Sequence, residues 1–157
     1  MAPMLCAVHD EVHRRLEERV FRTLEALIAL DPPGAVRHFR EFSEGLAIHM
    51  AIEDELVIPA WRPHAPTDGP GRADHLEGDH VVLVRLIGEI QGFLAEAVDL
   101  RTILKRLPSV YRLHGVMEHH TLREERVYRF LEGSLPSDAC EHLTARLAAL
   151  VDRLADG

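Results

Sequence analysis

The sequence predicts an all-α fold, an up-down-up-down antiparallel four-helix bundle with a short additional C-terminal helix. Between a few clusters of Gly and Pro, the chain is rich in Leu, Ala, Glu and Arg, with apolar residues at helical spacing. No segment alternates between apolar and polar residues as a half-buried strand would. Four long amphipathic segments joined by short connections are typical of such a bundle.

Clusters of Gly and Pro separate the expected helices. The first break is the Asp-Pro-Pro-Gly segment 31–34, and the longest loop, 59–71, contains four prolines. Asp99 is expected to cap the fourth helix, and Pro108 to kink or restart it. A Gly/Ser/Pro break over 133–138 precedes the last helix. The predicted helices span about residues 4–30, 35–60, 72–97, 100–132 and 138–155.

Length and charge exclude several classes of protein. We expect residues 1–157 to form a single domain, with a bundle core over about 5–132 and the C-terminal helix over about 138–155. The net charge of −8 argues against a nucleic-acid partner and against a polybasic membrane helix. No apolar run is long enough to span a bilayer, and no signal peptide is recognisable. The two cysteines, Cys6 and Cys140, provide neither a disulfide framework nor a Cys-based zinc site. Together these features predict a cytoplasmic protein.

Histidine, the commonest metal ligand, is unusually frequent, with 11 in 157 residues. On the second predicted helix, His49 and Glu53 lie one turn apart on the apolar stripe. His120 and Glu124 repeat this arrangement on the fourth helix, in a segment that aligns with the first without gaps. The apolar residues expected beside these pairs are Phe42, Ile52, Leu56 and Ala60 on the second helix, and Leu113, Val116, Met117, Val127 and Leu131 on the fourth.

The first and third predicted helices each place a histidine on their apolar face. His80 lies near the centre of the third helix's stripe, whereas His75 lies about 140° away from it. The first helix carries His9 and His13 on one face, and His13 is placed like His80 in its sequence context. His13 is therefore the preferred candidate, and His9 a possible additional ligand. The stripe around His80 is expected to contain Leu76, Leu83, Val84, Ile87 and Leu94.

These inward-facing polar residues predict a metal site. Burying Glu53 and Glu124 as unpaired anions would cost several kcal/mol each, and a cation removes that cost. Imidazoles with carboxylates suit Fe, Mn or Zn rather than Ca or Mg, and two inward glutamates suggest two bridged metals. A closed structural zinc site would use only four ligands. The candidate ligands are His13, His49, Glu53, His80, His120 and Glu124, with His9 as a possible addition.

The pattern of a lone His, His-x-x-x-Glu, a lone His and a second His-x-x-x-Glu resembles the hemerythrin-like, or HHE cation-binding, domain over about residues 5–132. The resemblance implies two non-haem Fe ions with oxo/hydroxo and carboxylate bridges, Zn or Mn being possible substitutes. It assigns the four histidines as iron ligands and the two glutamates as bridges. Oxygen-carrying hemerythrins have a His-x-x-x-His pair on the third helix, which His75 and His80 do not form. This departure favours a symmetric four-histidine centre over reversible oxygen carriage, unless His9 supplies a fifth ligand.

Two classes of function fit this interpretation. The preferred one is a protein that binds or senses O₂, NO or iron, with a small diatomic ligand as its partner. The alternative is an enzyme, either an oxidoreductase that consumes NO, O₂ or peroxide or a stress-repair protein that donates iron. A metal-free bundle is a third possibility. The sequence does not decide whether the protein turns over a substrate. The last helix covers a flank of the bundle or pairs two chains as a homodimer.

Several residues beside the candidate ligands are expected to have supporting, packing or surface roles. Asp54, Glu55 and Glu125 are expected to be solvated or to orient a ligand histidine. Tyr128 lies near the end of the site, where packing is its expected role. His114 is interpreted as a surface residue.

Overall fold

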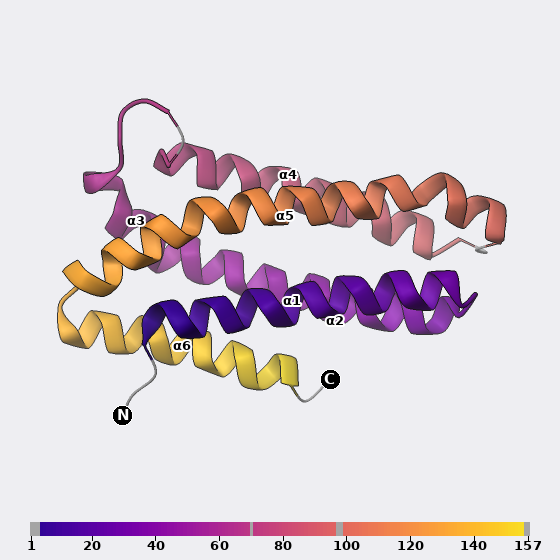
Figure 1. Ribbon diagram of the computed structural model, residues 1–157, viewed down its shortest axis with the longest axis horizontal. Helices are drawn as coiled ribbons and strands as arrows, with labels where there is room; N and C mark the ends of the chain where they lie inside the picture. The colour runs from indigo at the N-terminus through magenta and orange to yellow at the C-terminus, as the bar shows by residue number, and fades with distance from the viewer. Residues whose placement is uncertain (1–3, 70, 97–98, 156–157) are drawn as a thin grey trace.

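The computed structural model describes residues 4–69, 71–96 and 99–155 and is helical through most of them (Figure 1). This part of the chain contains no strand, so the predicted all-α class is confirmed. The helices are α1 (Leu5–Ile28), α2 (Pro32–Ile52), α3 (Ile58–Trp61), α4 (Ala73–Leu94), α5 (Leu100–Ser134) and α6 (Ser137–Ala155), with a π-helical turn η1 (Glu53–Val57) and a 3₁₀ turn η2 (Arg62–His64).

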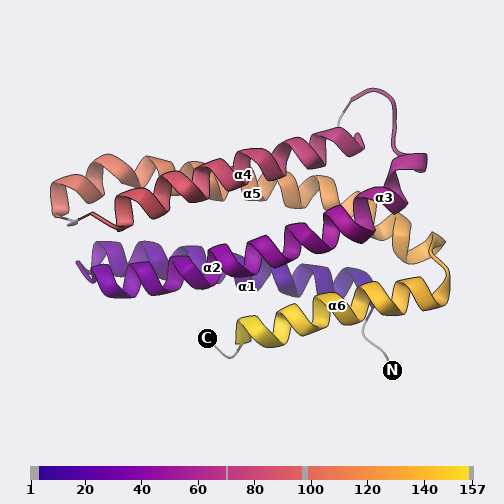
Figure 2. The same cartoon turned by 180° about the vertical axis from the view of Figure 1, so that it is seen from behind.

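The four long helices lie side by side, and successive ones run in opposite directions (Figures 1 and 2). Helix α1 contacts α2 and α5, and α4 contacts the same two helices, so the four enclose a common core. Helix α6 packs on α1 and α2, on the side away from α4 and α5. Its stripe of Leu143, Leu147, Leu150 and Leu154 is buried there. The stripe therefore covers a flank of the molecule, and a second chain could meet only another face of α6.

Several helix boundaries differ from the predictions. Helix α2 begins at Pro32 rather than near residue 35, because a proline is tolerated in the first helical turn and the Asp31 side chain caps Gly34 N–H. Helix α5 begins as expected, with Asp99 accepting a hydrogen bond of 2.7 Å from Thr102 N–H. Pro108 does not restart it, since α5 continues unbroken to Ser134. The predicted third-helix end at 97 lies outside the described residues.

The second predicted helix contains an interruption that its sequence pattern does not reveal. The π-helical turn η1 begins at Glu53, and its extra residue rotates everything that follows by about one position. Val57 and Trp61 are therefore buried, whereas Leu56 and Ala60, predicted on the inner stripe, are only half-buried. Helical structure also continues through His64, well into the predicted loop 59–71.

Helix α4 is less covered than predicted. Val84, expected on its inner stripe, is 58% exposed. The rest of that stripe is buried. Among the described helices, none combines the length and the apolar character needed to cross a membrane.

Candidate metal centre

The structure brings all seven predicted site residues into one buried cluster. His9 and His13 come from α1, the pair His49 and Glu53 from the junction of α2 and η1, and the other three from α4 and α5. The side chains are between 0% and 10% exposed, with His13 and His80 the least buried. The set consists of His9, His13, His49, Glu53, His80, His120 and Glu124.

Glu124 directs its two oxygens toward different histidines. Oε2 lies 3.2 Å from Nε2 of His9 and 2.9 Å from Nε2 of His13. Oε1 lies 2.5 Å from Nε2 of His120 and 3.7 Å from Nε2 of His49. This carboxylate therefore lies between the histidines of α1 and the histidine of its own helix, the placement required of a bridging ligand.

Glu53 uses only one oxygen toward the histidines. Its Oε2 lies 3.4 Å from Nε2 of His49, 3.2 Å from that of His80 and 3.5 Å from that of His120. Its Oε1 accepts a hydrogen bond of 3.1 Å from the hydroxyl of Tyr128, which is fully buried. Tyr128 thus does more than pack, because it holds one oxygen of Glu53 away from the centre.

Polar groups outside the cluster orient three of the rings. Nδ1 of His80 lies 2.9 Å from Asp54, and Nδ1 of His120 lies 3.3 Å from Asp79. In the neutral ring, these contacts hold the proton on Nδ1 and turn Nε2 toward the cluster. Asp54 thus orients a ligand histidine, which was one of its two expected roles. It follows Glu53 in the π-helical turn, but its side chain is exposed whereas that of Glu53 is buried.

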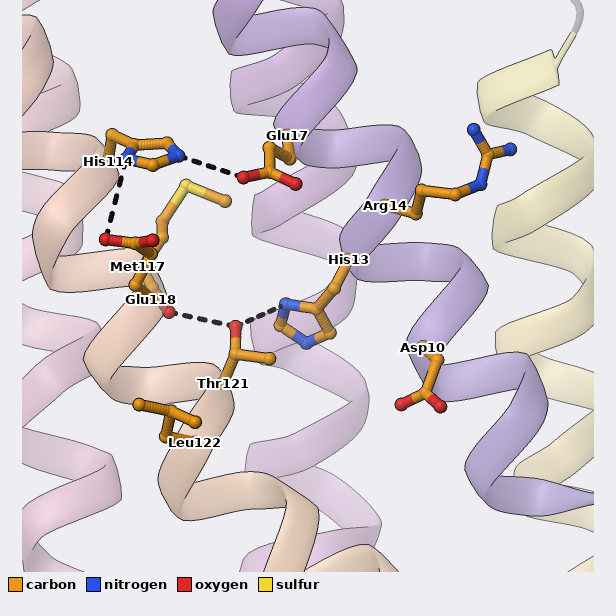
Figure 3. A pocket seen from close by; sticks show the side chains of 9 residues that line it. All are labelled: Asp10, His13, Arg14, Glu17, His114, Met117, Glu118, Thr121 and Leu122. Atoms are coloured by element: carbon orange, nitrogen blue, oxygen red, sulfur yellow. Dashed lines mark hydrogen bonds and ion pairs between the residues drawn. The ribbon is translucent and has the colours of Figure 1, made fainter.

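His13 is oriented by a hydroxyl instead of a carboxylate (Figure 3). The Thr121 hydroxyl donates to the carbonyl of Met117 at 2.9 Å and lies 2.8 Å from Nδ1 of His13. Because its hydrogen is already engaged, Nδ1 of His13 must donate to it. His13 therefore directs an unprotonated Nε2 toward Glu124.

In the metal-free site the pKa values of the histidines shift in different directions. Burial of His120 disfavours its charged form, but the charge of Glu124 and a hydrogen bond to Asp79 outweigh burial and hold the pKa of His120 well above its usual value. In His9 and His80 the contacts with glutamate likewise outweigh burial and raise the pKa. At His13 burial prevails and lowers the pKa to about 4.

The two carboxylates stay ionised despite complete burial. Burial raises the pKa of a carboxyl group, and each glutamate also repels the other. The surrounding histidines outweigh both effects, so the pKa of Glu53 is lowered and that of Glu124 is lowered well below its usual value. Tyr128, buried beside both anions, has a pKa well above its usual value and keeps its proton.

The protein's own atoms do not satisfy this cluster. Nε2 of His13 and both ring nitrogens of His49 are buried without a hydrogen-bond partner. Ring nitrogens that converge with carboxylate oxygens in a dry interior are groups that a bound cation would satisfy. The structure supplies two overlapping groups of donors within 4.8 Å of one another: His9, His13, His49 and Glu124, and then His49, Glu53, His120 and Glu124. The residues present therefore fit a bound metal cation, and the two groups have His49 and Glu124 in common.

Sequence reasoning missed Asp79 and Thr121, which support the ligands, and expected Tyr128 near the site to pack rather than to bind Glu53. Asp79 directly precedes His80 but serves His120 across the helix pair, so only tertiary packing reveals it. Thr121 and Tyr128 lie one residue and two turns beyond His120 on α5. A polar residue on the buried face of α5 was the available signal for Tyr128, whereas Thr121 gave none.

The comparison with known families agrees with this geometry. The sequence profile described as the hemerythrin HHE cation-binding domain matches residues 6–128, from the start of α1 to Tyr128. No significant match to the chain is found among curated proteins or among solved structures. The matched region includes every residue of the buried cluster and leaves out α6. The chain therefore belongs to the hemerythrin HHE cation-binding domain family.

Proposed function

We propose that this protein binds two iron ions in an antiparallel four-helix bundle and uses them to bind or sense O₂ or NO. His9, His13, His49, His80 and His120 would hold the ions, and Glu53 and Glu124 would bridge them. The proposal rests on one observation above all: buried histidine nitrogens without a hydrogen-bond partner lie beside two buried carboxylates.

The donor set favours iron and similar transition metals over Ca²⁺ and Mg²⁺. Imidazole nitrogen suits Fe, Zn and Mn, whereas Ca²⁺ and Mg²⁺ prefer oxygen ligands throughout. Seven donors from four helices exceed the four of a closed structural zinc site. Two carboxylates in a dry interior also offset the charge of two divalent ions, which isolated histidines would not.

Four of the five imidazoles lie in pairs at opposite ends of the cluster, and His49 lies near both glutamates. His9 and His13 lie at the oxygen of Glu124 that faces α1, whereas His80 and His120 lie around Glu53. His9 thus takes the place of the missing third-helix pair by supplying a fifth ring from α1. The iron pair would supply affinity for a diatomic ligand at coordination positions that the protein leaves open.

The chain's own residues would control the surroundings of that ligand. Tyr128 keeps its proton and donates a hydrogen bond to Oε1 of Glu53, which fixes the orientation of that carboxylate. Asp54 and Asp79 hold the rings of His80 and His120 in the tautomer that binds metal. Apolar side chains, including the fully buried Val12, exclude water around the cluster.

A metal count combined with spectroscopy tests this function. Protein grown with iron should contain two irons per chain, and visible spectra should be recorded anaerobically and then in air. A colour that appears in air and fades under vacuum would support reversible O₂ binding, whereas irreversible oxidation would favour NO, peroxide or iron-donation chemistry. Protein that acquires no iron would disprove the proposal.

A further inference from the structure

A pocket between α1 and α5 leads from solvent to the edge of the metal centre (Figure 3). Its volume is about 370 Å³, and we call it the α1–α5 pocket. His13 and Thr121 line it together, so the residue that orients His13 is also part of the wall. His13 is the site residue with the largest exposed fraction, 10%, and its Nε2 has no hydrogen-bond partner.

The polar part of the pocket lining is mainly acidic. Glu17 of α1 and Glu118 of α5 face His114, whose ring nitrogens lie 3.0 Å and 3.7 Å from them. Within the described residues, neither glutamate pairs with a lysine or an arginine. Arg14 is the one guanidinium in the lining, and Glu11 binds it through two hydrogen bonds of 2.7 Å. The field at the mouth is therefore one that attracts cations and repels anions.

The charge at the mouth matches that of the proposed cargo, because Glu17 and Glu118 are anions and Fe²⁺ is a cation. Two other hollows reach the centre. The hollow beside His80 is larger, about 520 Å³, but its Glu77 pairs with Arg62. The hollow beside His9 is smaller, about 250 Å³, and contains Arg129.

We propose that the α1–α5 pocket is the port through which Fe²⁺ reaches the centre. Glu17 and Glu118 attract the ion to the mouth by their charge, and His13 receives it at the floor. This role rests on the proposed function, because a port is needed only where a metal pair is assembled. It assigns a purpose to these two exposed carboxylates.

The rate of iron uptake tests the port separately from the centre. Metal-free protein would be mixed anaerobically with Fe²⁺, uptake stopped at intervals with a chelator, and bound iron counted. The Glu17→Gln/Glu118→Gln variant should take up iron about tenfold more slowly at low salt and reach the same final count. High salt should remove most of the difference, because it screens exposed charges. The matched control is Glu77→Gln/Glu89→Gln, which removes two exposed carboxylates of α4 and should load at the wild-type rate.

In a second pair of variants, one places a positive charge at the mouth and leaves Glu17, His114 and Glu118 unchanged, and the other is its control. Leu122 lines the pocket and is 63% exposed, so Leu122→Arg should fold normally and slow uptake. Leu104, on the same helix and 61% exposed, provides the control Leu104→Arg. Equal uptake rates in port and control variants would disprove the port while two bound irons upheld the centre. A wild-type protein that binds no iron at equilibrium would instead overturn the proposed function itself.

Discussion

His13 and Glu124 face each other with Nε2 and Oε2 only 2.9 Å apart, and the ring's hydrogen lies on the opposite nitrogen. Thr121 engages that hydrogen, and the low pKa of His13, about 4, keeps the ring neutral at physiological pH. A lone pair therefore points at a carboxylate oxygen. Such a contact is repulsive unless a cation lies beside both atoms, so this pair of atoms is a suitable position for a bound metal ion.

Replacing the bridging carboxylate should abolish assembly of the metal pair. Glu124→Gln keeps the shape of the side chain but removes the charge that faces His9, His13 and His120. We expect the variant to fold and to lose the rise in Tm that iron gives the wild type. Glu125→Gln, a change at the exposed neighbouring position, is the control and should keep that rise. A Glu124→Gln protein that still binds two irons would contradict the bridging role.

Removing His9 separates a five-histidine centre from a symmetric four-histidine one. His9 lies 3.2 Å from Glu124 and is 1% exposed. His9→Gln should weaken binding of one of the two ions by at least tenfold, which a competition titration against a chelator would measure. His75→Gln, at an exposed position on α4, should leave both affinities unchanged. If His9→Gln also leaves them unchanged, the four remaining histidines suffice.

The sequence identified the inward histidines because a buried polar residue stands out on an apolar stripe. His49, His80 and His120 needed only helical periodicity, and the two glutamates followed from their spacing. Periodicity failed at the π-turn, because one inserted residue shifts the stripe from Leu56 to Val57 and leaves no mark in the sequence.

Contacts that cross between helices were also beyond reach. The bonds from Asp79 to His120 and from Tyr128 to Glu53 join residues 41 and 75 positions apart. Helical periodicity can place each residue on a face of its helix, but it does not give the relative height, that is, the axial register, of two neighbouring helices. Only the packed structure fixes that height, so the ligands were predictable and most of their partners were not.

The Tyr128 hydroxyl should contribute to stability as well as to ligand geometry. Tyr128→Phe leaves Oε1 of Glu53 buried without its hydrogen-bond donor, which should lower the free energy of unfolding of the metal-free protein by about 1–3 kcal/mol. Denaturant titration would measure this loss. Tyr111→Phe, at a position 58% exposed, should cost almost nothing. Equal stabilities of Tyr128→Phe and the wild type would show that the hydroxyl bond is not maintained in solution.

Acidity should act in opposite directions on the metal-free fold and on metal binding. The raised pKa of His120 gives stability that is present below the ordinary value of 6.5 and is lost as pH rises through the raised value. The lowered pKa of Glu124 gives stability that is present above the ordinary value of 4.5 and is lost as pH falls through the lowered value. The metal-free protein should therefore be most stable between these ordinary values and weaken as the pH rises above 6.5.

Metal binding must displace the proton that His120 holds, so iron affinity should rise over the range in which the metal-free fold weakens. The difference in Tm between loaded and metal-free protein should consequently widen as the pH rises above 6.5, as scanning calorimetry in matched buffers would show. Because burial keeps these groups from salt, added salt should change the trend little. A difference that stays constant across this range would mean that no proton leaves the cluster when the metal binds, and the histidine ligation would have to be abandoned.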